Sequence, residues 1–179
     1  MLLELTRYRQ PLGHFSRTFE PAEAGQGEEA YRIVAPVRLD FDIHKDKDRF
    51  RLTGTVQSEL ELGCSRCLEP YRLPVDAGFD VRYHPASEMS VEHDHELPEE
   101  DLETSYYRDD QIDLNELLRE QFYLALPMKP LCQEGCRGLC PHCGTNRNSG
   151  ECQCSAAWED PRLAPLKALQ GGALKDGAP

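Results

Sequence analysis

Two runs of alternating apolar and polar residues in the first half of the chain predict an antiparallel hairpin. The first run begins near Tyr31, and its apolar side chains on one face are Val37, Leu39, Phe41 and Ile43. A polar stretch over residues 44–48 predicts the turn, and the second run then carries its apolar side chains at Phe50, Leu52, Val56, Leu60 and Leu62. A period of two is typical of strands with one buried face. Gly54, inside the second run, indicates a bulge or a bend.

A third run with the same period follows, with apolar side chains at Leu73, Val75, Ala77, Phe79, Val81 and Tyr83. Pro74 has no N–H to donate to a ladder, which predicts an edge position or a bulge near the start of this strand. Residues 3–8 could add a short strand, and residues 21–29 are a polar, glycine-containing loop. Three or more such strands predict a sheet that could curl toward a barrel.

The stretch over residues 84–110 breaks this pattern, because ten of its residues are acidic and few are apolar. The composition predicts a solvated acidic loop. His93 and His95 lie in it without nearby cysteine or glycine, so we interpret them as surface-loop histidines rather than as metal ligands. Tyr106 and Tyr107 could form one more short strand before the next element.

A helix is predicted over residues 113–126. Asp113 is the expected N-cap, Glu116 three residues later completes a capping-box pattern, and Pro127 ends the run. The apolar stripe at helical spacing consists of Leu114, Leu117, Leu118, Phe122 and Ala125. We favour packing of this stripe on the sheet over a partner-binding role, because a sheet with one apolar face needs a cover.

The cysteines carry the clearest chemical signal, since six of the eight lie within residues 131–154, between glycines. Two cysteines three residues apart and followed by a glycine are typical of a zinc knuckle, in which backbone N–H groups turn toward the thiolates. The spacing predicts two sets of four ligands. One set is Cys64, Cys67, Cys132 and Cys136, and the other is Cys140, Cys143, Cys152 and Cys154. We therefore expect about two Zn²⁺ ions per chain.

Other assignments of the cysteines stay open at this point. Cys64 and Cys67 could instead share an ion with Cys140 and Cys143, because two knuckles often face each other across one metal. A thiol-exchange role is less consistent with the pattern, since a reactive cysteine usually lies at a helix N-terminus and these pairs lie between strands or in glycine-rich segments. Phosphate-loop, nucleophile-elbow and His-Glu-x-x-His motifs are not found, so we expect no enzymatic activity.

Composition limits the functional classes further. The net charge is −12 and the isoelectric point is near 4.9, which is unlike a protein that grips nucleic acid with its whole surface. The charged N-terminus and the lack of a long apolar run predict a soluble, cytoplasmic protein with no membrane association. In a reducing compartment, cysteines are better explained as metal ligands than as disulfides.

The predicted fold class is α+β: an antiparallel, barrel-like sheet covered by one helix, with a cysteine-rich zinc-binding C-terminal module. Residues 1–130 would form the β domain with its acidic loop (84–110) and covering helix (113–126). Residues 131–170 would form the zinc module, including a short helix that Asp160 and Pro161 begin, and residues 171–179 a disordered tail.

Three ordered blocks of sequence resemble one known family. They are Cys-Ser-Arg-Cys-Leu-Glu-Pro at residues 64–70, the helix and following Leu-Pro-Met-Lys-Pro-Leu-Cys at residues 112–132, and the segment from Cys136 to Leu163 with its Cys-Pro-His-Cys-Gly motif. Together they are similar to the YceD family of large-ribosomal-subunit RNA accumulation proteins. The resemblance implies a bacterial, non-enzymatic factor that supports synthesis, processing or stability of large-subunit (23S) ribosomal RNA. The alternative is a zinc-dependent chaperone or holdase.

A basic patch could explain how an acidic protein serves an RNA process. Arg66, Arg72, Lys129, Arg137 and Arg147 lie next to the cysteines in sequence, so folding that joins the cysteines would gather these cations. Each arginine could equally balance thiolate charge at a zinc site. The expected partner is pre-ribosomal large-subunit RNA, a basic ribosomal protein or an assembly factor, and no small-molecule substrate is expected. The acidic loop would face away from RNA or approach a basic protein.

Overall fold

The computed structural model describes residues 1–25, 30–88, 104–154 and 162. The strands are β1 (Leu2–Glu4), β2 (Leu12–Phe19), β3 (Arg32–Ile33), β4 (Val37–Asp46), β5 (Arg49–Gly63), β6 (Pro70–Pro85), β7 (Thr104–Tyr107) and β8 (Gln111–Asp113). The α-helix is α1 (Leu114–Ala125), and two short 3₁₀ helices span Leu5–Arg7 and Ala86–Glu88. No helix in the described part of the chain is both long and apolar enough to cross a membrane.

The main sheet has the strand order β2-β4-β5-β6-β7, with β3 also paired to β5. All of its pairs are antiparallel except β6 and β7, which run parallel because the chain passes through residues 86–103 before β7 begins. The predicted barrel is wrong: within the described residues, β2 and β7 at the two ends of the order do not pair, and the sheet stays open. A separate two-stranded sheet joins β1 to β8.

The three predicted strands form the centre of this sheet. The inward side chains of β4 and β5 are almost fully buried, and the register is continuous from Asp46 opposite Arg49 at the turn to Arg38 opposite Gln57. The predicted bulge at Gly54 is not present, because this ladder runs through it unbroken. Gly54 instead allows a close approach: an added Cβ would lie 2.1 Å from the carbonyl oxygen of Asp40.

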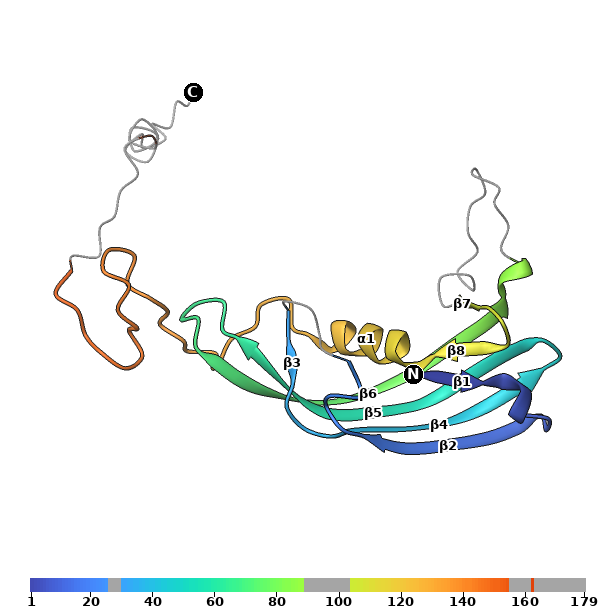
Figure 1. Ribbon diagram of the computed structural model, residues 1–179. Helices are drawn as coiled ribbons and strands as arrows, with labels where there is room; N and C mark the ends of the chain where they lie inside the picture. The colour runs from blue at the N-terminus through green and yellow to red at the C-terminus, as the bar shows by residue number, and fades with distance from the viewer. Residues whose placement is uncertain (26–29, 89–103, 155–161, 163–179) are drawn as a thin grey trace, which may run out of the picture. The chain divides into compact units, whose positions relative to one another are not determined.

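Helix α1 and the small β1–β8 sheet cover the apolar face of the main sheet (Figure 1). Asp113 caps the helix as predicted, and its carboxylate accepts a hydrogen bond of 2.8 Å from the N–H of Asn115. The buried side chains of the helix are Leu114, Leu117, Leu118, Gln121 and Phe122. Phe122 packs edge-on against Tyr31, with ring centroids 5.7 Å apart. The apolar stripe therefore serves as core packing.

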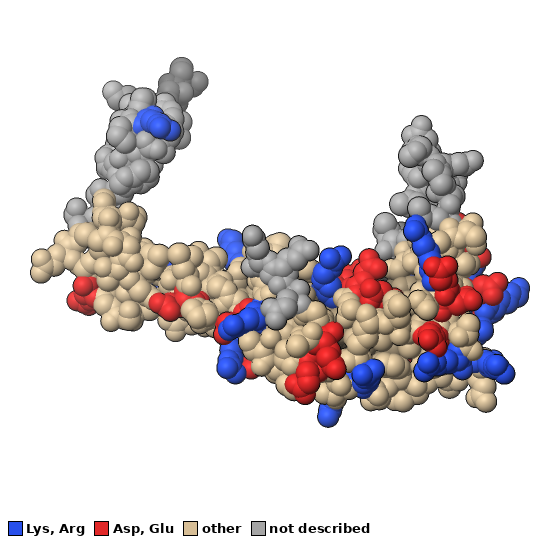
Figure 2. All heavy atoms as spheres, in the orientation of Figure 1, with Lys and Arg blue, Asp and Glu red and all other residues tan. Residues whose placement is uncertain are grey.

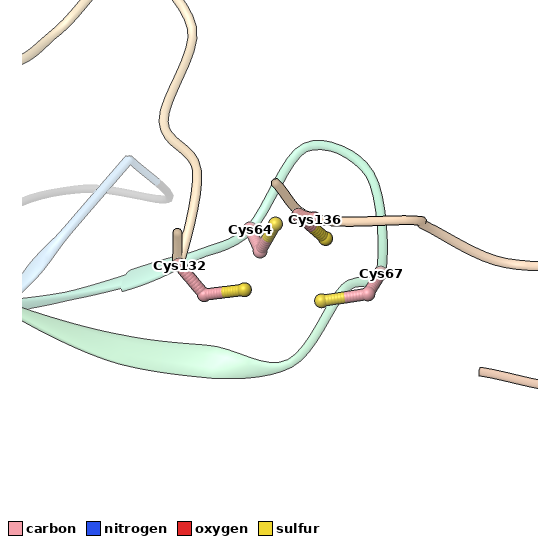
Figure 3. Close-up of side chains that lie close together, drawn as sticks. All are labelled: Cys64, Cys67, Cys132 and Cys136. Carbon is pink, nitrogen blue, oxygen red and sulfur yellow. The ribbon is translucent and has the colours of Figure 1, made fainter. Parts of the chain in front are cut away.

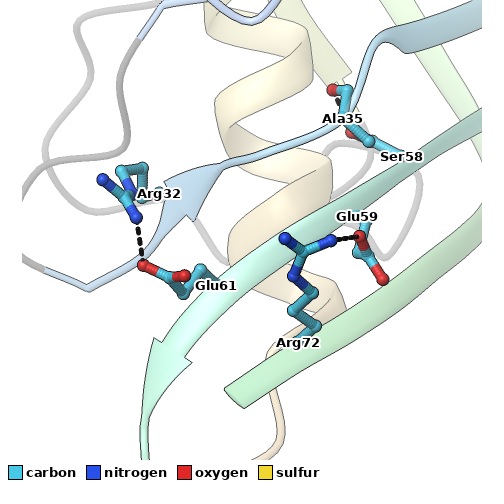
Figure 4. Close-up of polar contacts among 6 residues, drawn as sticks. All are labelled: Arg32, Ala35, Ser58, Glu59, Glu61 and Arg72. Atoms are coloured by element: carbon cyan, nitrogen blue, oxygen red, sulfur yellow. Dashed lines mark hydrogen bonds and ion pairs between the residues drawn. The ribbon is translucent and has the colours of Figure 1, made fainter. Parts of the chain in front are cut away.

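The C-terminal half of β5 is bordered by β3 and β6, and polar contacts link these strands (Figure 4). Arg32 on β3 pairs with Glu61 on β5, and Arg72 on β6 pairs with Glu59 at 3.0 Å. The hydroxyl of Ser58 donates to the carbonyl oxygen of Ala35 at 3.1 Å. These surface pairs link the strands that lead to the first cysteine pair.

By their packing, the residues divide into two compact units. The sheet unit comprises Met1–Cys64 and Glu69–Cys132, and the cysteine-rich unit comprises Ser65–Leu68 and Gln133–Pro179. The histidines at positions 93 and 95 and the predicted helix from residue 160 lie outside the described residues.

Candidate metal centres

Four cysteines from distant parts of the sequence form the first cluster. Cys64 follows the last residue of β5, Cys67 lies in the turn before β6, and Cys132 and Cys136 follow α1. Their sulfur atoms all lie within 4.8 Å of one another. Figure 3 shows the four side chains pointing toward one another. Cys64, Cys67 and Cys136 are buried and Cys132 is partly exposed, so the cluster is shielded from solvent on most sides.

The turn between β5 and β6 positions the first two of these sulfurs. The N–H of Cys64 donates to the carbonyl oxygen of Glu69 at 2.9 Å and closes the turn. Leu68, which lies between Cys67 and Glu69 in this turn, adopts a left-handed conformation with φ of 63° and exposes 70% of its surface. Such a conformation is unfavourable for a leucine, and the surrounding structure must hold it in place.

The second cluster consists of Cys140, Cys143, Cys152 and Cys154, whose sulfurs also lie within 4.8 Å of one another. The first two belong to a knuckle closed by two backbone hydrogen bonds of 2.9 Å: Cys140 N–H to the Thr145 carbonyl, and Gly144 N–H to the Cys140 carbonyl. Gly144 has φ of 73°, which explains why a glycine follows the knuckle. Cys143 and Cys154 are exposed, so this cluster is more open to solvent than the first.

Hydrogen bonds prepare two sulfurs of the second cluster to carry negative charge. The backbone N–H of Cys143, followed by that of His142, lowers the pKa of the Cys140 thiol. The Thr145 hydroxyl and then its backbone N–H lower the pKa of Cys143 to about 6. The opposite holds across the cluster: the sulfur of Cys140 raises the pKa of Cys152, and that of Cys143 raises the pKa of Cys154 to about 12.

These opposed shifts follow from crowding four ionisable sulfurs into one small volume. Two of them can be thiolates beside N–H donors, and each thiolate then opposes ionisation of its neighbours. A divalent cation removes that opposition by binding all four as thiolates. Four thiolates in a tetrahedral set are the ligands of structural zinc, and the donor chemistry of both clusters suits such an ion. The two sets are also the ones expected from the sequence.

Asn148 contacts one of the sulfurs of the first cluster, a role that the sequence did not predict. Its side-chain amide nitrogen lies 3.2 Å from the sulfur of Cys136, and its amide oxygen accepts a 2.7 Å hydrogen bond from the N–H of Arg137. An N–H donor to a thiolate stabilises the charged form and orients the ligand. The sequence marked this residue only as part of a turn, because nothing local distinguishes a turn asparagine from one that contacts sulfur.

A short backbone ladder supports the cysteine-rich unit. The N–H of Leu139 donates to the Arg66 carbonyl at 3.1 Å, and the N–H of Arg147 donates to the Gly138 carbonyl at 2.9 Å. Gly138 has φ of 70°, and an added Cβ would lie 3.0 Å from the Arg66 carbonyl oxygen. Both the conformation and the close approach favour glycine here.

The structure gives the five residues of the expected basic patch different surroundings. Arg66 donates through Nη1 to the Cys136 carbonyl at 2.9 Å, and Arg72 pairs with Glu59. Arg137 and Arg147 line one hollow of about 340 Å³ beside the second cluster. Lys129 lies in the segment after α1. Two of the five therefore share a surface, while Arg66 and Arg72 engage partners within the fold.

Comparison with known proteins matches residues 52–170 to the family model described as "Large ribosomal RNA subunit accumulation protein YceD". The match covers well over half of the chain and includes all eight cysteines. The chain belongs to the YceD family. Both cysteine clusters and α1 lie inside the matched region, so the candidate metal sites belong to the part of the chain that the YceD match covers.

Several curated relatives support this assignment. The chloroplastic "Large ribosomal RNA subunit accumulation protein YCED homolog 1" of Arabidopsis thaliana is 26% identical over 161 residues, 78% of this chain and 50% of the relative. Its namesake in Zea mays is 28% identical over 169 residues, 75% of this chain and 53% of the relative. The uncharacterized protein YlbN of Bacillus subtilis is 27% identical over 156 residues, 87% of this chain and 86% of the relative.

The chain thus spans about half the length of the two plant relatives. No solved structure gives a significant match.

Proposed function

We propose that this YceD-family protein is a non-enzymatic, cytoplasmic ribosome-biogenesis factor that supports the synthesis, processing or stability of large-subunit ribosomal RNA. The family match over residues 52–170 carries the proposal, together with the two plant relatives named for accumulation of this RNA. Its partner would be pre-ribosomal large-subunit RNA, a basic ribosomal protein or an assembly factor.

Zinc would act here as a structural element. A closed set of four thiolates leaves no open coordination position for a reacting water, which favours a folding role over catalysis. The irregular segment from Gln133 to Cys154 contains few buried side chains among its described residues. Metal coordination can supply the folding energy that such a segment cannot obtain from an apolar core.

Depletion of the protein from its own cells tests this function. The expected result is a lower ratio of large-subunit to small-subunit ribosomal RNA, or an accumulation of large-subunit precursors, restored by the wild-type gene. Restoration should fail with Cys64→Ser/Cys67→Ser, because the first metal site would be lost. A normal ratio of the two RNAs after complete depletion would refute the proposal.

A holdase is the second candidate, and exposed apolar side chains near the end of α1 favour it. Leu124 exposes 74% of its surface and Met128 is fully exposed. Flexible, exposed methionines and leucines are typical of surfaces that bind varied apolar segments. The zinc-loaded protein would then suppress aggregation of an unrelated unfolded protein, and Leu124→Ser/Met128→Ser would remove that activity. Suppression of aggregation with unchanged ribosomal RNA in depleted cells would replace the first proposal by the second.

A further inference from the structure

The outer face of the main sheet carries a basic row that the sequence analysis did not identify. His44 on β4 is the register partner of Arg51 on β5, and Arg51 is the register partner of Arg82 on β6. Arg82 in turn lies opposite Thr104 on β7. Neighbouring strands are about 4.8 Å apart, so three basic side chains follow one another across three strands.

Such a row is unfavourable for the stability of the fold. Like charges directly opposite each other in an antiparallel pair destabilise it. Asp80 relieves part of the repulsion, because Arg51 binds its carboxylate through Nε at 2.7 Å and also through Nη2. Arg82 forms no ion pair within the described part of the chain, although its charge contributes to the lowered pKa of Asp80. Arg82 is thus a cation for which the described part of the fold supplies no ion pair, and such departures from local consistency are typical of functional sites.

The row forms part of a wider hollow of about 720 Å³ on the sheet unit, here called the sheet hollow. The basic side chains that line it are His44, Lys45, Arg49, Arg51, Arg82 and His84. The acidic residues that line it are Asp46 and Glu88, and Glu88 is bound by Arg49 at 3.0 Å. With Asp80, which binds Arg51, also counted, four lysines and arginines face three carboxylates, so the sheet hollow is slightly basic in a protein whose net charge is −12.

A second hollow of the sheet unit has the opposite character. It measures about 960 Å³, lies beside α1, and is lined by Asp113, Glu116 and Glu120 against Arg108 and Arg119. Figure 2 shows, on the face that it draws, lysines and arginines mixed with acidic residues over the sheet unit rather than one continuous basic face. An anionic ligand would therefore be drawn to the sheet hollow rather than to the surface as a whole.

An aromatic ring in the same hollow narrows the class of ligand. Tyr106 on β7 exposes 41% of its surface and lies opposite His84 on β6, with their rings edge to face and centroids 6.5 Å apart. Acidic peptides and free phosphate need cations alone. Single-stranded RNA presents phosphates together with unstacked bases, and exposed aromatic rings on a sheet bind such bases by stacking.

We propose that the sheet hollow binds single-stranded RNA, with phosphates held by Arg82, Arg51 and His44 and a base stacked on Tyr106. The proposal rests on the ribosome-biogenesis function above and names a binding surface for it, distinct from the arginines beside the cysteine clusters. Arginine suits this task because its guanidinium presents several N–H donors to phosphate oxygens. A small number of bound phosphates predicts modest affinity and a correspondingly small salt dependence, with a log–log slope of about −0.7 for each phosphate bound.

The test uses the full zinc-loaded chain and a fluorescein-labelled single-stranded RNA of mixed sequence, followed by fluorescence anisotropy at several salt concentrations. Arg82→Gln/His44→Gln should weaken binding about tenfold and reduce the steepness of the salt dependence by about 0.7 for each phosphate that the variant no longer binds. Arg82→Lys in place of Arg82→Gln should retain most of the affinity. Tyr106→Leu should weaken binding at least about fivefold with an unchanged salt slope.

Arg38→Gln is the matched control. Arg38 is exposed on β4, six residues before His44 and on the same face, but it does not line the sheet hollow. The control should bind RNA as the wild type does, and each variant should keep its zinc content and thermal stability. Equal weakening by Arg38→Gln and Arg82→Gln, or unchanged binding in all variants, would overturn the proposal. The proposal would also be overturned if the protein bound a polyglutamate peptide but not RNA, and if Arg82→Gln weakened the binding of that peptide.

The outcomes also separate this site from the proposed function. If depletion lowers large-subunit RNA while Arg82→Gln/His44→Gln restores it fully and binds RNA normally, the sheet hollow is rejected and the function stands. If depletion leaves that RNA unchanged while the variants lose RNA binding as described, the site stands and the function is rejected.

Discussion

Replacement of Cys64 and Cys67 by serine tests both the metal content and the grouping of the cysteines. The structure places these two sulfurs within 4.8 Å of those of Cys132 and Cys136. A serine hydroxyl stays protonated at neutral pH and is a poor zinc ligand, so the first site should be lost. Zinc per chain should fall from about two to about one, because the second cluster keeps all four of its ligands.

The expected energetic effect is large. Zinc binding to structural sites contributes about 10–16 kcal/mol at neutral pH, which is comparable to the whole free energy of unfolding of a typical domain, about 5–15 kcal/mol. Loss of the first ion should therefore release the chain around Cys132 and Cys136 from its ordered conformation. Removal of both ions with a chelator should loosen the whole segment from residue 132 to residue 154.

The assay combines metal analysis with thiol alkylation and mass spectrometry of the native protein. In the double variant, Cys132 and Cys136 should become labelled while Cys140 and Cys143 stay protected. The reciprocal variant, Cys152→Ser/Cys154→Ser, should show the reverse pattern, and Ser65→Ala should keep both ions. Labelling of Cys140 and Cys143 in the Cys64→Ser/Cys67→Ser variant would refute the grouping. Eight reactive thiols and no zinc in the wild type would refute the metal sites altogether.

Two glycines give predictions with matched controls in the same unit. Gly54→Ala should lower the free energy of unfolding of the sheet unit by about 3 kcal/mol or more, because its Cβ would lie 2.1 Å from the Asp40 carbonyl oxygen. Gly78→Ala on the neighbouring strand has its nearest atom at 3.8 Å and should be neutral or stabilising in the same denaturant titration. Gly138→Ala should cost about 1–2 kcal/mol, since its φ of 70° is left-handed, and zinc should be released to a chelator more readily. Gly135→Ala, with no atom within 4 Å of its added Cβ, should release zinc as the wild type does, and equal release from both variants would contradict the strain argument.

Local sequence determined the elements whose pattern is carried by their own residues. The period of two in β4, β5 and β6 was sufficient because almost every inward position of these strands is apolar or a glycine, Lys45 and Ser58 being the polar ones. Asp113 likewise marked the start of α1, since an N-cap binds an N–H only two residues away. The close spacing of the cysteines within each pair predicted metal chemistry for the same reason.

Strand β2 shows where this local signal ends. Its inward positions include Gly13 and Arg17, so the alternation that marks the other strands is interrupted and no strand was predicted there. The structure shows how the inward face accommodates both residues. The guanidinium of Arg17 lies 4.8 Å from the centroid of the Phe19 ring, and an added Cβ on Gly13 would lie 2.6 Å from the ring of Tyr8. A cation above an aromatic ring can occupy an apolar face, but no sequence period records it.

The same limit applies to pairing between distant segments. Sequence spacing alone could not exclude a closed barrel or the cross-pairing of cysteines, and it could not predict the ion pair between Arg72 and Glu59, because each depends on which strands and loops the fold brings together. The sequence also could not predict the parallel pairing of β7 with β6 or the basic row over β4, β5 and β6, because both depend on the pairing between strands. A strand's own residues fix which side chains face outward, whereas the register between strands decides which of those side chains become neighbours.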